Sequence, residues 1–170
     1  MQRFYSEALQ DERIVPKIEG NFEQKIESEM RLFLPTPDVK MAFSSMKNKQ
    51  ELEKVLQSAS EVMFPHLENH EIDVASVASD GDTPVHIAAV WGDKYAVELL
   101  LDAGAAIDVL GDMSATPLYN AVGQEHIEVA ELLLSRGANP DIMSDLGYSP
   151  RTLANSKGGN LSKLFDKYAA

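Results

Sequence analysis

Two histidines four residues apart are the side chains of this 170-residue chain best suited to metal chemistry. His66 and His70 would share one face of a helix, with Glu68 and Glu71 beside them, and imidazole nitrogens are common zinc ligands. Pro65 and its loop-like surroundings argue against a helix, and two histidines do not complete a ligand set. We therefore interpret them as ordinary surface residues and expect no metal and no cofactor.

Other catalytic patterns are missing from the sequence. It contains no phosphate-binding glycine loop, no Gly-x-Ser-x-Gly and no His-Glu-x-x-His. Asp80-Gly81-Asp82 is similar to the start of a calcium loop but lacks the distal glutamate. The chain has no cysteine, which excludes disulfides and thiolate metal ligands. We predict a protein that is not an enzyme.

Negative charge is concentrated in one part of the chain. The formal net charge is −12, of which residues 1–60 carry −1, residues 61–150 carry −14 and residues 151–170 carry +3. Such a field disfavours nucleic acid, which needs a basic patch. It attracts a basic protein, although an acidic surface also serves solubility alone. No apolar run reaches the roughly 18 residues of a membrane span, and we expect no signal peptide and a cytoplasmic location without membrane contact.

A repeat of fixed period organises the chain from residue 78 onward. The block Thr-Pro-Val-His-Ile-Ala-Ala at 83–89 returns as Thr-Pro-Leu-Tyr-Asn-Ala-Val at 116–122, and Ser-Pro-Arg-Thr-Leu-Ala follows after an equal step at 149–154. A second block, Glu-Leu-Leu-Leu with a following Gly-Ala, occurs at 98–105 and, after the same step, at 131–138. A fixed period with matching blocks in register predicts a stack of identical supersecondary units.

Each unit can be interpreted as a helix, a tight turn, a second helix and an extended turn, here called a finger. Threonine before proline suits a helix N-cap, and Gly104 and Gly137 suit the left-handed residue that ends a helix. We predict helices at 84–91, 95–103, 117–123 and 127–135. They should bury Ala88, Leu100, Ala121 and Leu133 between units.

On these blocks the chain resembles the ankyrin repeat, whose signature is Thr-Pro-Leu-His-x-Ala. The resemblance implies an all-α solenoid of helix-turn-helix units with β-turn fingers, made of repeats 78–110 and 111–143 and a C-terminal cap, 144–170. His86 holds the signature histidine position, which implies a structural role. The second unit departs from the pattern, with Tyr119 at that histidine position and Ser114 and Glu125 in place of glycines.

Upstream of the repeats we predict an N-terminal capping unit and a further helical segment. The capping unit, 39–77, would hold two helices around 41–43 and 51–56 and an insertion at 60–71 that forms a loop. Residues 1–38 show no repeat, and apolar residues at helical spacing predict an amphipathic helix over 21–33. We therefore expect an N-terminal helical extension, 1–38, followed by an ankyrin repeat domain, 39–170.

The resemblance also implies a binding surface, because finger tips and the exposed side of the first helix line a concave groove in ankyrin arrays. Six apolar residues hold such positions without being needed for stacking, and carboxylates flank them. The predicted partner-binding residues are Asp80, Asp82, Trp91, Leu110, Asp112, Met113, Gln124, Met143, Asp145, Leu146 and Tyr148. The alternative is that segment 1–38 or the insertion folds back over this stripe.

Three function hypotheses follow. The first is a protein-binding inhibitor of a basic partner, because small acidic ankyrin chains resemble the immunity proteins that neutralise a cognate bacterial toxin. The second is a general adaptor, a regulatory protein or a host-directed effector without catalytic activity. The third is an enzyme or metal protein centred on His66 and His70.

Overall fold

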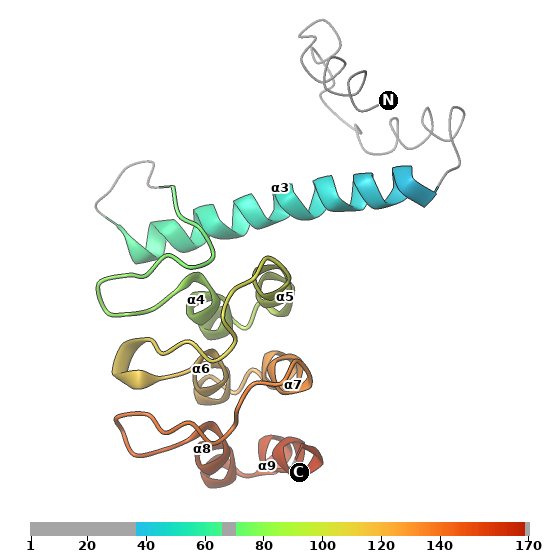
Figure 1. Cartoon of the computed structure of the whole chain (residues 1–170). Helices are drawn as coiled ribbons and strands as arrows, with labels where there is room; N and C mark the ends of the chain where they lie inside the picture. Colours follow the sequence, from blue (N-terminus) through green and yellow to red (C-terminus); the bar gives the residue numbers. More distant parts are fainter. Residues whose placement is uncertain (1–36, 66–70, 169–170) are drawn as a thin grey trace, which may run out of the picture. The chain divides into compact units, whose positions relative to one another are not determined.

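The part of the chain described by the computed structural model comprises residues 37–65 and 71–168, and within it the secondary structure is helical with no strand (Figure 1). This confirms the predicted all-α repeat fold. The elements in chain order are α3 (Pro37–Met63), α4 (Pro84–Trp91), α5 (Lys94–Asp102), the 3-10 helix η1 (Asp112–Ser114), α6 (Pro117–Gly123), α7 (Ile127–Ser135), α8 (Pro150–Lys157) and α9 (Gly159–Lys167).

Three of the four predicted repeat helices have the predicted bounds, and the fourth, α5, is displaced by one residue. The α5 helix begins at Lys94 because the Asp93 side chain accepts a hydrogen bond from the Ala96 backbone N–H, 2.9 Å away. This bond satisfies one of the free N–H groups at a helix start. Thr116 caps α6 in the same way, and Ser149 caps α8.

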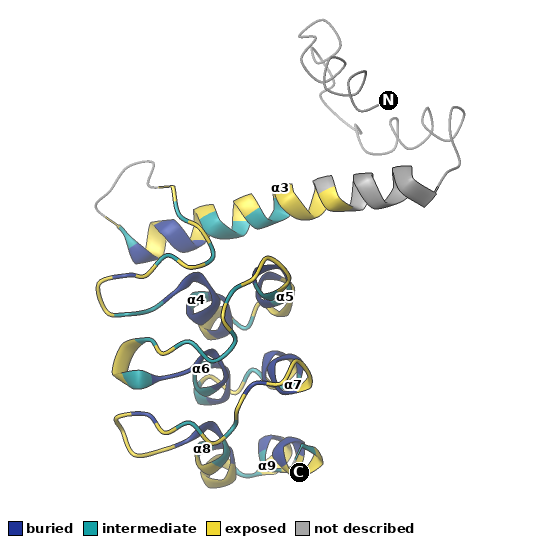
Figure 2. Ribbon diagram, in the orientation of Figure 1, coloured by how far each residue is buried: buried dark blue, intermediate teal, exposed yellow. Residues whose placement is uncertain are grey.

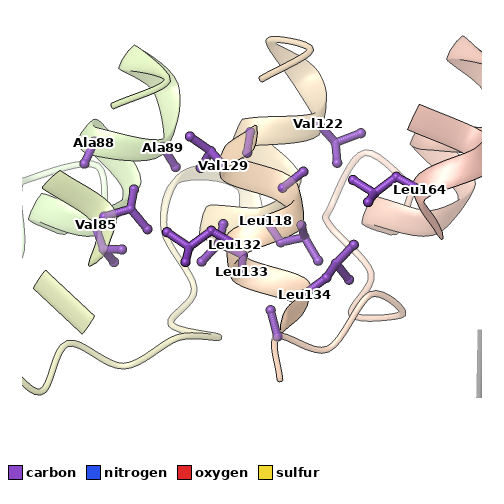
Figure 3. Close-up of a cluster of buried hydrophobic side chains, with 14 of the residues drawn as sticks. Val85, Ala88, Ala89, Leu118, Val122, Val129, Leu132, Leu133, Leu134 and Leu164 are labelled. Atoms are coloured by element: carbon purple, nitrogen blue, oxygen red, sulfur yellow. The ribbon is translucent and has the colours of Figure 1, made fainter. Parts of the chain in front are cut away.

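The helices stack as three pairs, α4 with α5, α6 with α7, and α8 with α9 (Figure 1). The first helices of successive pairs pack on one another, and so do the second helices. Leu100 and Leu133, in α5 and α7, are fully buried, as are Ala88 and Ala121 in α4 and α6. Figure 3 shows this apolar core passing from one pair to the next. The predicted burial between units is therefore confirmed.

The second unit keeps the repeat's backbone conformation where it lacks the repeat's glycine. Glu125 follows α6 with φ of 61°, close to the 73° of Gly92 after α4. His126 is half-buried, and its ring donates from Nε2 to the Val90 carbonyl, 2.9 Å away. Any Cβ on Gly92 would collide with this ring, so that glycine is needed for space as well as for φ.

The expectation of two short helices in the capping unit is wrong. Residues 37–63 form the single helix α3, because no glycine or proline occurs between Pro37 and Pro65 to end it. The segment 60–71, expected to be a loop, begins inside this helix, and Ala59, Ser60 and Met63 are buried. The last turns of α3 thus contribute to the core instead of forming an inserted loop.

The chain divides into two units, Met1–Ser45 and Met46–Ala170, and the helix pairs lie in the second. The predicted extension 1–38, apart from Pro37 and Asp38, lies outside the described residues, as does its helix at 21–33. His66, Glu68 and His70 also lie outside them. None of the helices described is both long enough and apolar enough to cross a bilayer.

Candidate partner-binding surface

Three fingers, 72–83, 105–116 and 138–149, precede α4, α6 and α8 and project from the same side of the stack (Figure 1). Hydrogen bonds join neighbouring fingers. The Asp112 N–H donates to the Asp82 carboxylate over 3.1 Å, and the Asp145 N–H donates to the Met113 carbonyl over 2.9 Å. The Ser114 hydroxyl donates to the Asp145 carboxylate, also over 2.9 Å. The three fingers therefore form one connected row along the array, here called the ledge.

The predicted acidic residues divide into two kinds. Asp82 is half-buried, and its carboxylate accepts a hydrogen bond from Asp112 of the following finger. The Asp145 carboxylate accepts one from Ser114 of the preceding finger, so both residues hold the ledge together. Asp80 and Asp112 are exposed, and neither forms an ion pair with another described residue. These two carboxylates are the better placed to meet a partner.

All six predicted apolar residues are exposed, with fractional exposures between 44% and 57%. Figure 2 shows exposed residues along the fingers. Five belong to the fingers and one, Trp91, ends α4. Gln124 follows α6 and is also exposed. The six are Trp91, Leu110, Met113, Met143, Leu146 and Tyr148.

Sequence reasoning missed one residue of this surface. Val77 is 57% exposed and stands one repeat period before Leu110, which stands one period before Met143. The three residues thus occupy one repeat position on consecutive fingers and form an aliphatic column along the array. The period itself could have identified Val77, but the first predicted repeat begins at residue 78 and leaves it out.

The second finger has an unusual backbone at its tip. Met113 and Ser114 both have left-handed φ values, 51° and 56°, and the Ala115 N–H donates to the Asp112 carbonyl over 2.9 Å. Positive φ at both central residues is the mark of a type I′ turn, which normally takes asparagine or glycine. A methionine in this conformation is strained, and the turn presents its side chain to solvent.

His86 joins the first unit to the second finger, as the implied structural role requires. Its Nδ1 accepts from the Thr83 N–H over 3.1 Å. Because carbonyls only accept, Nε2 carries the proton and donates to the Val109 and Ala115 carbonyls, each 3.1 Å away. Burial lowers the pKa of His86 below 6.5, opposed mainly by the nearby Asp82 carboxylate. His86 is therefore neutral and structural at pH 7.

Four basic side chains of the array are paired with carboxylates away from the finger tips. Arg136 of the α7 end bridges Glu98 and Asp102 of α5 at 2.9 and 2.7 Å, and Lys167 of α9 pairs with Glu131 of α7 at 2.8 Å. The Lys167 ammonium lowers the pKa of Glu131 through this hydrogen bond. Arg151 and Lys157 pair with Asp141 and Glu125. These cations link units, and none of them pairs with Asp80 or Asp112.

The candidate metal ligands His66 and His70 lie outside the described residues. Within them there is no group of three or more histidine, cysteine, aspartate or glutamate side chains able to hold an ion. Asp80 instead accepts the Asp82 N–H over 3.1 Å, a local turn contact. The arrangement of the fingers is suited to contact with another macromolecule.

Comparisons with known proteins agree with this geometry. A family model described as ankyrin repeats, in three copies, matches residues 47–144. Rabankyrin-5 from Homo sapiens is 32% identical over 72 residues, and that from Mus musculus is 31% identical over 72 residues. Each match covers 42% of this chain and 6% of the relative, so the chain spans a small part of either protein. The chain belongs to the ankyrin repeat family, and its array is a protein–protein interaction module of a typically non-catalytic kind.

Proposed function

We propose that this chain binds a protein with a basic contact surface and blocks it, as an immunity protein neutralises its cognate toxin. The contact is made by the finger surface, defined as the eleven predicted residues together with Val77. The observation that carries the proposal is the set of exposed apolar side chains on the same fingers as Asp80 and Asp112, two exposed carboxylates that form no ion pair within the described part of the chain. Apolar patches with a charged rim mark interaction sites, and tyrosine and tryptophan are frequent anchors.

Charge supports a basic partner. Residues 61–150 carry −14, and the paired cations of α7, α8 and α9 are committed to carboxylates other than Asp80 and Asp112. A partner with complementary charge is drawn to this surface by long-range attraction. A nucleic acid would be repelled.

An inhibitory role follows from the same charge. Enzymes that act on acidic substrates carry basic surfaces to bind them, and an acidic module seated on such a surface competes with the substrate. Binding of this kind needs neither a catalytic group nor a cofactor in the module. We place this activity in the cytoplasm, and the partner is a toxin or effector enzyme.

The test begins with affinity capture from the native host by the full chain, followed by mass spectrometry and purification of the captured protein. Tyr148→Ala and Trp91→Ala should weaken its binding by about 2 kcal/mol or more if both are central anchors. The association rate should fall as salt rises, because exposed charges are screened beyond roughly 8 Å at physiological ionic strength. Tyr95→Ala is the matched control, since Tyr95 is similarly exposed at the start of α5 and outside the finger surface.

A partner whose affinity ignores both substitutions, or whose association rate ignores salt, would contradict the proposal. Binding that depends on the finger surface but leaves the activity of the partner unchanged would identify an adaptor or regulatory protein instead.

A further inference from the structure

The aliphatic column of Val77, Leu110 and Met143 carries information about the shape of the partner. Each residue is more than half exposed, and each holds the same repeat position on consecutive fingers. Backbone and side-chain hydrogen bonds tie these fingers into one ledge. The column therefore repeats with the spacing of the stacked units.

That spacing is set by helix packing. The first helices α4, α6 and α8 stack directly on one another, and packed helices lie roughly 8–10 Å apart. A partner that contacts all three residues must offer apolar groups at steps of about this length along one face.

An α-helix meets this requirement and a strand does not. With a rise of about 1.5 Å per residue, seven residues of helix advance about 10.5 Å, and residues seven apart drift by only about 20° around the axis. A strand advances roughly 3.3 Å per residue and turns alternate side chains to one face, so it offers steps of about 6.6 or 13 Å.

We propose that the finger surface binds an amphipathic basic helix of the partner, with apolar residues at every seventh position seated on Val77, Leu110 and Met143. Reaching from the first contact to the third takes about 15 helical residues. Lysine or arginine residues beside the apolar positions would face Asp80 and Asp112, which are exposed and unpaired among the described residues. This inference rests on the proposed function, because it specifies the partner element that the same surface takes.

Three synthetic peptides of about 20 residues test the helix directly with the full-length chain. The first has leucines at every seventh position among alanine and lysine. The second has the same composition with leucines at every fifth position, which scatters them around the helix. The third is the first with a central proline on its lysine face, which breaks the helix. Fluorescence anisotropy measures the affinity of each.

We expect the first peptide to bind roughly tenfold or more tightly than the other two, the size of one interface anchor, and to gain helical circular dichroism on binding. Leu110→Ser in the chain should remove most of this advantage, whereas Ile127→Ser should not, because Ile127 is an exposed residue at the start of α7, outside the column. Melting temperatures of both variants verify that they fold.

Equal affinity for the three peptides, or an unchanged preference in Leu110→Ser, would overturn the helix inference. The proposed function is judged separately by the captured partner. If that partner loses affinity in Tyr148→Ala while the peptides show no preference for the seven-residue spacing, the partner binds the finger surface through another element. If no partner depends on the finger surface, the proposed function itself fails.

Discussion

The Ser144 hydroxyl donates to the Tyr148 carbonyl over 2.9 Å. One repeat earlier, Ala115 holds the position of Tyr148, and its carbonyl accepts from Nε2 of His86 over 3.1 Å. Gly111 stands there in place of Ser144 and supplies no side chain. Two different donors thus serve the same carbonyl at the bases of consecutive fingers, a serine in one and a histidine of the preceding unit in the other.

The His86 contact with the second finger should require glycine at residue 111. A Cβ on Gly111 would collide with the Asp82 carboxylate and lie 2.9 Å from His86 Nε2. We expect Gly111→Ser to lower the free energy of unfolding by about 1–3 kcal/mol, the usual cost of overpacking. Urea denaturation measures this change. A stability equal to that of the natural chain would show that the base of the second finger, here called the first junction, can accept a serine as the base of the third finger does.

The reciprocal exchange at the base of the third finger, here called the second junction, predicts coupling between residues 119 and 144. Ser144→Gly should cost about 1 kcal/mol, because it leaves the Tyr148 carbonyl with one donor fewer. Adding Tyr119→His should recover part of this loss, since the ring can donate as His86 does. We expect a coupling free energy of roughly 0.5–3 kcal/mol from the double-mutant cycle. Strictly additive effects would mean that the two positions act independently.

Acid should weaken the first junction through His86. Its pKa is lowered in the folded chain, first by burial, so the unfolded chain binds more protons as the pH falls below the ordinary value of 6.5. The part of the folding stability that depends on neutral His86 is therefore fully present above about pH 6.5. It is lost as the pH falls from there toward the folded pKa. Denaturation between pH 7 and pH 5 should show this slope, with a shallower slope in His86→Gln. Equal slopes in both proteins would assign the effect to other groups.

Truncation of the buried leucines should destabilise the array. Leu100→Ala and Leu133→Ala remove fully buried side chains and should each cost about 2–5 kcal/mol. Because each unit is held by its neighbours, the whole array should unfold in one transition at a lower temperature. Leu110→Ala is the matched control, since Leu110 is 52% exposed, and its melting temperature should barely change.

Met113 should lower the free energy of unfolding of the chain but strengthen its binding to the partner. Asparagine tolerates left-handed φ far better than methionine, so Met113→Asn should raise the free energy of unfolding by up to about 1 kcal/mol. The same change removes an exposed apolar contact and should weaken binding to the captured partner. Met143→Asn, at a residue outside the left-handed positions of the described chain, should weaken binding without the gain in stability. A gain in both variants would refute the strain argument.

The repeat helices could be predicted closely because their signals are local. Threonine or serine before proline, small residues in the first helix and a leucine block in the second recur in register, and α4, α6 and α7 have the predicted bounds. The helix α3 is less predictable. Its sequence lies outside the register, and analogy with the other units divides a run that is uninterrupted between Pro37 and Pro65.

The sequence by itself determined the stacked units and the buried leucines, because the repeat period encodes both, and its resemblance to the ankyrin repeat implied the exposed positions of the fingers. Only the tertiary structure decided which polar side chains hold the fingers together. Asp82 contacts Asp112 and Ser114 contacts Asp145, partners 30 and 31 residues apart. Such contacts depend on how one unit rests on the next, which no local pattern of residues specifies.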